Sequence, residues 1–167
     1  NQLRIIGGQW RGRKLGFTGI EGLRPTPDRV RETLFNWLAP DITGTRCLDL
    51  FCGSGALGLE ALSRGAARVD MVDTARAAVQ QLRSNIALLK ADTSQVKHDN
   101  ALSWLARSHE PYDIVFLDPP FRTGLALQCL TAIIIVQQQL LKYQAWIYLE
   151  MGSYDHTPAL SLLWQLH

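Results

Sequence analysis

The residues best suited to chemistry form the tetrapeptide Asp118-Pro119-Pro120-Phe121, which follows an apolar run ending at Leu117. An exocyclic amine on a nucleobase is a poor nucleophile because its lone pair is delocalised into the ring. The Asp118 carboxylate and the Pro119 carbonyl could accept the two amine hydrogens and aim the nitrogen at an electrophile. Pro120 stiffens the turn, and Phe121 offers a flat face for a base taken out of its stack. A turn that only ends the strand, with Phe121 buried, is the alternative.

A second candidate site is the run Asp49–Gly58, DLFCGSGALG, which contains the pattern GxGxxG. It lies between an apolar run and a helix-length segment, which is the context of a nucleotide-type cofactor loop. Glycine at 53 and 55 permits positive φ and removes Cβ atoms that would keep a ligand from the backbone. The candidate cofactor contacts here are Phe51, Gly53, Ser54 and Gly55, although a tight turn without a ligand would also explain the glycines.

Acidic residues beside this loop distinguish between two cofactors. Asp49 lies four residues before Gly53, where its carboxylate would repel the pyrophosphate of a dinucleotide. S-adenosyl-L-methionine carries an ammonium, a sulfonium and no phosphate, so Asp49 favours this cofactor. Asp73, after the next apolar run, is placed to accept hydrogen bonds from ribose hydroxyls of either cofactor. We expect the adenine against Asp99-Asn100-Ala101, although each of these acids could instead be a surface or capping residue.

Short apolar runs alternate with helix-length segments from Thr45 onward. The pattern predicts strands at 47–51, 69–72, 95–98, 113–117, 145–149 and 162–166, and helices at 56–64, 75–91, 102–108 and 125–141. Such alternation requires crossover connections and therefore a mostly parallel sheet. The expected fold is α/β, a Rossmann-like doubly wound sheet with helices on both faces. Because the sequence ends on a strand, we expect the strand that would complete the sheet to be missing.

The region before Thr45 carries the positive charge. Leu3–Phe17 is predicted to form a β-hairpin, and a helix follows from Thr26 or Asp28 to Leu38, before Pro40. Residues 1–31 hold seven Arg or Lys against two Asp or Glu, a net charge of +5, whereas the whole chain has +2. A basic arm on a mildly acidic body indicates contact with a polyanion, although a solvated, charged terminus explains the charge equally well.

Length and composition limit the class of protein. The chain has 167 residues, of which 47% are hydrophobic and 19% charged, as expected for one globular domain. We divide it into a basic β extension (1–22), a linking loop and helix (23–44) and a core (45–167). No apolar run approaches the roughly 20 residues that cross a bilayer, and no signal-peptide pattern opens the chain, so a cytoplasmic location without membrane contact is expected. Three cysteines without CxxC spacing predict free thiols and no metal site.

Together these motifs resemble those of a known family. DLFCGSG at 49–55, Asp73 and DPPF at 118–121 look like the motifs of class I S-adenosylmethionine-dependent amino methyltransferases. The segments RIIGGQWRGRKL at 4–15 and LRPTPDRVRETLFNWL at 23–38 resemble more narrowly the bacterial 16S rRNA guanine-N2 methyltransferases of the RsmD type. The resemblance implies a monomeric enzyme that methylates N2 of one guanine in 16S rRNA, on the small ribosomal subunit or its assembly intermediate.

The resemblance also implies roles for the N-terminal residues. Arg24 and Thr26 would lie beside the entrance for cofactor and RNA, and the hairpin would bind RNA. The expected RNA contacts are Arg4, Trp10, Arg11, Arg13, Lys14 and Arg29. Three alternatives remain open: an amino methyltransferase acting on DNA adenine or protein glutamine, an NAD-dependent oxidoreductase, and a non-catalytic RNA-binding assembly factor. Asp49 weighs against the oxidoreductase, and the intact tetrapeptide weighs against the assembly factor.

Overall fold

The computed structural model describes residues 1–19, 25–107, 110–120 and 123–150. Its elements are β1 (Gln2–Arg4), β2 (Lys14–Gly16), α1 (Asp28–Leu38), β3 (Arg46–Asp49), α2 (Ala56–Ser63), β4 (Arg68–Asp73), α3 (Arg76–Leu89), β5 (Ser94–His98), α4 (Ala101–Leu105), β6 (Tyr112–Leu117), α5 (Leu125–Leu140) and β7 (Leu141–Leu149). Every strand and helix predicted between residues 45 and 149 is present, with boundaries shifted by a few residues. The strand predicted at 162–166 lies outside the described residues.

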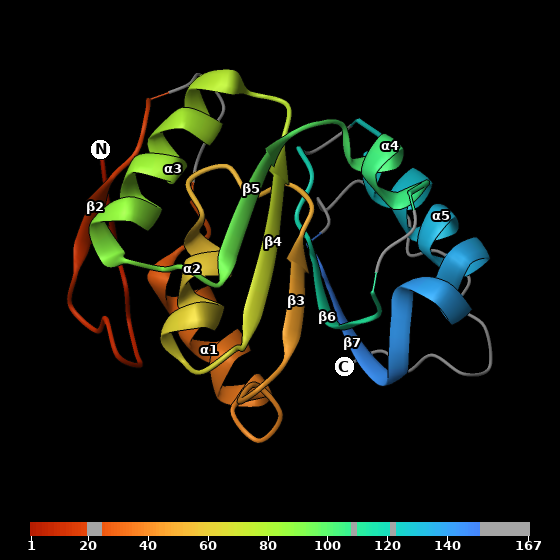
Figure 1. Ribbon diagram of the computed structural model, residues 1–167, viewed down its shortest axis with the longest axis horizontal. Helices are drawn as coiled ribbons and strands as arrows, with labels where there is room; N and C mark the ends of the chain where they lie inside the picture. The colour runs from red at the N-terminus through yellow and green to blue at the C-terminus, as the bar shows by residue number, and fades with distance from the viewer. Residues whose placement is uncertain (20–24, 108–109, 121–122, 151–167) are drawn as a thin grey trace.

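The five-stranded sheet has the order β5-β4-β3-β6-β7, and its neighbouring strands are parallel. Helices α1, α2 and α3 lie on one side of the sheet, and α4 and α5 lie on the other (Figure 1). The predicted doubly wound, mostly parallel sheet is therefore confirmed. Strands β3 and β6 are neighbours at its centre, so the loop after β3 and the turn after β6 meet at the same edge.

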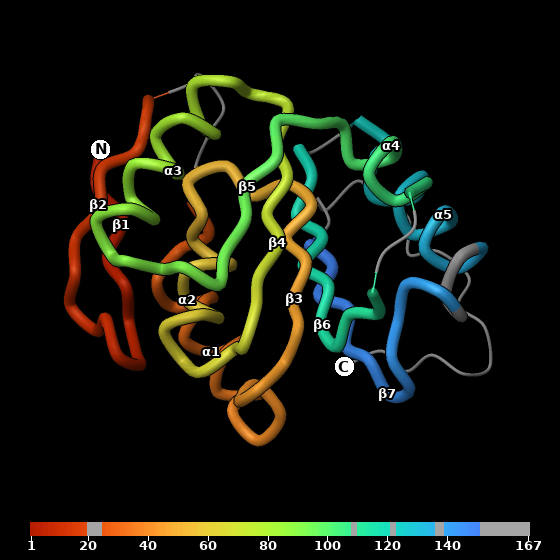
Figure 2. The backbone as a smooth tube through the Cα atoms, viewed as in Figure 1, coloured from red at the N-terminus to blue at the C-terminus, as the bar shows by residue number. Residues whose placement is uncertain are grey.

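The predicted N-terminal hairpin is also confirmed. Strands β1 and β2 are antiparallel, with Leu3 opposite Leu15, and both side chains are buried. The hairpin runs beside α3 (Figure 2), where the Asn85 side chain donates a hydrogen bond to the Gly16 carbonyl. The basic segment is thus attached to the core rather than being a free arm.

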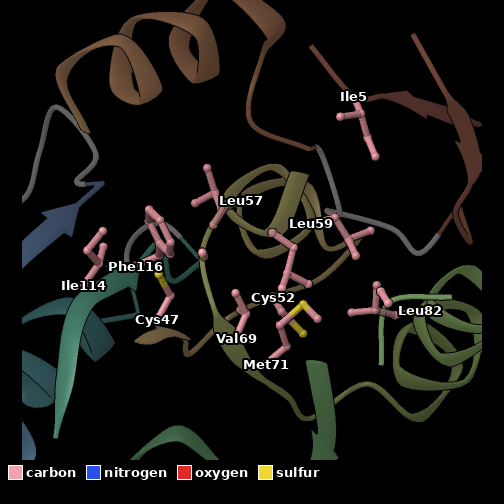
Figure 3. Packing of buried hydrophobic residues seen from close by; sticks show 14 of the residues in the cluster. Ile5, Cys47, Cys52, Leu57, Leu59, Val69, Met71, Leu82, Ile114 and Phe116 are labelled. Carbon is pink, nitrogen blue, oxygen red and sulfur yellow. The ribbon is translucent and has the colours of Figure 1, made fainter. Parts of the chain in front are cut away.

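Side chains that point alternately to the two faces of the sheet form two hydrophobic layers. In β3, Cys47 faces the layer under α1, α2 and α3, whereas Leu48 faces the layer under α4 and α5. Figure 3 shows side chains of the first layer, including Leu59 of α2, Met71 of β4 and Phe116 of β6. Each large aliphatic side chain buried in such a layer contributes about 1.5–3 kcal/mol.

The apolar residues of α1 recur at helical spacing but are not all buried. Leu34, Phe35 and Leu38 are buried, whereas Val30 and Trp37 are 38% and 64% exposed. The buried positions follow helical spacing, which leaves Val30 and Trp37 at the margin of the stripe.

The three cysteines are free and buried, in agreement with the predicted free thiols. No helix of the described residues is long and apolar enough to cross a membrane. Within the same residues, His, Cys, Asp and Glu side chains form no group able to hold a metal ion.

Candidate active site

The glycine loop joins β3 to α2 and depends on backbone conformations that favour glycine. Gly53 and Gly55 have φ values of 50° and 83°. A Cβ atom on Gly55 would lie 2.5 Å from Cδ1 of Leu82. Ser54 is buried within the loop and Phe51 is half-buried at its start. The loop is thus a close-packed, buried turn at the carboxyl edge of the sheet.

Asp73, at the end of β4, shapes the same loop. Its Oδ2 accepts a hydrogen bond from the Gly53 amide at 2.8 Å, and its Oδ1 accepts one from the Ala75 amide at 2.8 Å. Each carboxylate oxygen keeps a further lone pair. The predicted contact with ribose hydroxyls is compatible with this arrangement and stays a prediction.

Asp49, at the end of β3, is fully buried beneath the loop. Its Oδ2 accepts a hydrogen bond from the Gly58 amide at 3.2 Å, while its Oδ1 has no partner among the described residues. Burial raises the pKa of Asp49 to about 8, and the charges of Asp118 and Asp73 add to the effect. An unpaired buried carboxylate oxygen is costly, and a cation nearby would offset the cost. This environment fits the positive groups of S-adenosylmethionine and opposes a pyrophosphate.

The predicted adenine site follows β5. Asp99 is half-buried; its Oδ1 accepts a hydrogen bond from the Asn100 amide at 2.7 Å and its Oδ2 pairs with Arg107 at 2.7 Å. The Asn100 side chain caps α4 by accepting from two backbone amides. Ala101 is buried at the start of that helix. The side-chain oxygen of Asn100 therefore has a local role in capping α4, and the predicted contact of these residues with adenine stays a prediction.

Asp118 follows β6 at the same edge of the sheet and is half-buried. Its Oδ2 accepts a hydrogen bond from the Thr26 hydroxyl at 3.2 Å, so the linking loop before α1 reaches the tetrapeptide. Pro119 is buried and Pro120 exposed, whereas Phe121 and Arg24 lie outside the described residues. Burial, and next the charge of Glu150, raise the pKa of Asp118 to about 6, while the Thr26 hydrogen bond opposes this rise.

Glu150 is a neighbour of Asp118 that our sequence analysis missed. Leu117 is opposite Leu149 in the register of β6 and β7, and the Glu150 amide donates to the Leu117 carbonyl at 2.9 Å. The Tyr148 hydroxyl donates a hydrogen bond to the Glu150 carboxylate. The signal was present, since Glu150, like Asp73 and Asp118, is an acid that directly follows a predicted strand.

The candidate RNA contacts lie on the hairpin and at the start of α1. Arg4, Arg11, Arg13, Lys14 and Arg29 are exposed. Trp10 is half-buried and packs against the first hydrophobic layer, and its amide donates to the Ser63 hydroxyl at 3.0 Å. The hairpin therefore presents cations to solvent while its backbone is anchored on α2.

Arg31 does not face solvent or phosphate, the two orientations expected for an arginine in the basic segment 1–31. Its side chain is 1% exposed and lies 3.6 Å from the carboxylate of Glu60, which is fully buried. It also pairs at 2.6 Å with Asp28, three residues earlier on the same helix. The link to Glu60 joins residues far apart in the chain, and no local pattern could show it.

Comparison with known proteins shows which family the chain belongs to. A family model described as "Conserved hypothetical protein 95" matches residues 3–167. The chain is 52% identical over 166 residues to the ribosomal RNA small subunit methyltransferase D of Escherichia coli K12, covering 99% of this chain and 83% of that protein. It is 46% identical to the enzyme of the same name from Haemophilus influenzae, covering 89% and 78%. The chain belongs to the RsmD family.

Solved structures agree with this assignment. A methyltransferase structure from Escherichia coli matches with a TM-score of 0.88 at 51% identity and covers 100% of this chain and 90% of that one. A methylase structure from Haemophilus influenzae matches with a TM-score of 0.80 at 38% identity and covers 97% and 87%. The resemblance to RsmD-type enzymes found in the sequence is therefore confirmed.

Proposed function

We propose that this member of the RsmD family transfers a methyl group from S-adenosylmethionine to the exocyclic N2 of one guanine in 16S rRNA. The observation that carries the proposal is the meeting of two acids at the ends of neighbouring strands. Asp49 offers an unpaired, buried oxygen beside the glycine loop, and Asp118 offers a half-buried carboxylate suited to an amine. The relatives named as small subunit rRNA methyltransferases support the choice of rRNA.

The cofactor, when bound, supplies an electrophilic methyl group on its sulfonium. Asp118 and the Pro119 carbonyl accept the two hydrogens of N2 and orient the nitrogen lone pair along the line of attack. The nitrogen gains positive charge as the new bond forms, and the Asp118 carboxylate stabilises that charge. The proton that N2 then loses passes to Asp118 or to water, so no strong base is needed. Phe121 would stack on the extruded base.

The basic hairpin would bind the rRNA backbone near this site. Its exposed arginines and lysine can neutralise phosphates of the backbone. The candidate active site lies elsewhere, at the carboxyl edge of the five-stranded sheet. By the resemblance to the family, Arg24 and Thr26 would lie beside the entrance for cofactor and RNA. The substrate would be the small ribosomal subunit or its assembly intermediate, methylated in the cytoplasm by a monomer.

The direct test is transfer of labelled methyl from S-adenosylmethionine to unmodified small ribosomal subunits, with deproteinised rRNA and DNA in parallel. Nucleoside analysis then identifies the product. Label in N2-methylguanosine, preferentially on subunits, is the expected result. Label in methyladenosine, or cofactor binding without any label on rRNA, would reject the proposed substrate.

Activity is expected to fall as the pH drops through about 6, because protonated Asp118 accepts one hydrogen fewer from the amine. The change Glu150→Gln removes a negative charge that raises the pKa of Asp118, so the acid limb of the kcat profile should move to lower pH. Glu110→Gln, at an acid whose side chain is 83% exposed, is the matched control and should leave the limb in place. An unshifted limb in Glu150→Gln would mean that Asp118 and Glu150 are not coupled.

Binding to rRNA should depend on the exposed arginines of the hairpin. The double change Arg11→Glu with Arg13→Glu is expected to weaken binding and to lower the slope of log affinity against log salt by about 2, since each phosphate contact contributes about 0.9 to that slope. Filter binding across a salt series measures it. A slope equal to that of the unchanged protein would show that the hairpin does not touch phosphate.

A further inference from the structure

Arg31 occupies a junction between three parts of the molecule. Its Nε donates a hydrogen bond to the Thr26 carbonyl at 3.1 Å, and its Nη1 donates one to the Arg4 carbonyl at 3.0 Å. Its Nη2 pairs with Asp28 at 2.6 Å, and Nη1 lies 3.6 Å from Glu60. One buried guanidinium therefore joins the linking loop, the end of β1 and helix α2.

Three of these partners lead to regions with proposed functions. Thr26, whose carbonyl Arg31 holds, donates its hydroxyl to Asp118 at 3.2 Å. Arg4 ends β1, the strand that leads into the basic hairpin. Glu60 accepts hydrogen bonds from the amides of Ile6 and Gly7 in the same hairpin, at 2.9 and 3.2 Å. Arg31 and Thr26 thus form a path of side-chain contacts from the hairpin to the Asp118 carboxylate, and a more exposed pair between Arg4 and Asp28, at 3.1 Å, also joins β1 to the start of α1.

We propose that Arg31 is a positioning residue for methyl transfer: its guanidinium holds Thr26 where the Thr26 hydroxyl orients Asp118, and it fixes the basic hairpin relative to that site. The inference rests on the proposed role of Asp118. The planar fork of arginine can serve several acceptors at fixed angles, whereas a lysine ammonium is a compact charge on a flexible stem. Lysine at this position would keep the charge and lose the alignment.

Arg64 provides a matched control. It also pairs with Glu60, at 3.4 Å, and its side chain is 17% exposed. In the described part of the chain, Arg64 makes no hydrogen bond or ion pair with Thr26 or Asp118. The change Arg64→Lys therefore disturbs the same buried carboxylate but leaves the contacts from Arg31 to Thr26 and from Thr26 to Asp118 in place.

The experiment measures kcat, KM for small ribosomal subunits and cofactor affinity in Arg31→Lys, Thr26→Val, the double variant and Arg64→Lys. We expect kcat about 10-fold lower in Arg31→Lys and in Thr26→Val, which corresponds to about 1.4 kcal/mol of activation free energy. Cofactor affinity should be unchanged in Arg31→Lys, because the Arg31 side chain contacts none of the candidate cofactor residues of the glycine loop. The double variant should be no slower than the slower single variant, because both changes break one path. Thr26→Ser, which keeps a hydroxyl, should restore most of the activity.

Additive losses in the double variant, or equal losses in Arg31→Lys and Arg64→Lys, would overturn the inference while leaving the methyltransferase activity of the unchanged protein in place. If the unchanged protein transfers no methyl group, the proposed function itself fails.

Thermal unfolding shows whether Arg31→Lys folds. If it does not, Asp28→Asn weakens the shortest contact of the guanidinium and should lower kcat about twofold, in line with a small misalignment; an unchanged kcat there would equally overturn the inference.

Discussion

Replacing Asp118 with alanine is expected to lower kcat by about 10²–10³-fold, the usual effect of removing one group that stabilises charge in a transition state. The amine of guanine would lose the carboxylate that accepts its hydrogen, and its lone pair would stay delocalised. Cofactor affinity should change little, because the glycine loop, Asp49 and Asp73 are intact. Single-turnover methyl transfer and equilibrium cofactor binding measure the two quantities separately.

Asp113 supplies the control for this variant. It lies at the other end of β6, where its carboxylate accepts a hydrogen bond from the Arg46 amide at 2.8 Å and pairs with Lys142 at 3.0 Å. Asp113→Asn should therefore affect stability more than kcat. A kcat of Asp118→Ala within the range of the Asp113→Asn variant would remove Asp118 from the mechanism.

The parts of the site that the sequence predicts are those specified by local pattern. The run from 49 to 58 and the tetrapeptide from 118 to 121 are each contiguous, and each follows an apolar strand. Parallel strands bring their carboxyl ends to one edge, so predicting the strands was sufficient to place Asp49, Asp73 and Asp118 together. The alternation of strands and helices likewise predicted the sheet, because the crossover rule leaves few topologies.

The parts that the sequence does not predict depend on contacts between distant segments. The approach of Thr26 to Asp118 spans 92 positions, and the pairing of Glu60 with the Ile6 amide spans 54. Arg31 illustrates the same limit, since it belongs to the basic segment 1–31, which suggests exposure, whereas tertiary packing buries it. A charged side chain can be buried only where other groups bind it, because an unpaired buried charge is costly. For Arg31 most of these groups belong to distant segments, which a local sequence pattern does not show.

Glu60→Ala is expected to destabilise the protein by about 3–5 kcal/mol, the usual cost of breaking a buried ion pair by removing one partner. The carboxylate is fully buried, and its loss leaves the amides of Ile6 and Gly7 without their acceptor and Arg31 without one of its two anionic partners. Since about 1 kcal/mol shifts Tm by roughly 2–4 °C at this size, Tm should fall by about 10 °C. Thermal and urea unfolding measure the change.

An exposed ion pair separates this effect from the general loss of a charge. Glu110 pairs with Arg46 at 3.3 Å, but its side chain is 83% exposed. Water screens such a pair, so Glu110→Ala should cost at most about 1 kcal/mol. The loss of unfolding free energy in Glu60→Ala beyond that in Glu110→Ala measures what the buried Glu60 carboxylate contributes. That contribution includes its hydrogen bonds to the hairpin, which attach the hairpin to α2. Equal destabilisation by both changes would show that the hairpin is held by its apolar contacts, Leu3, Ile5 and Leu15, and that Glu60 does not anchor it.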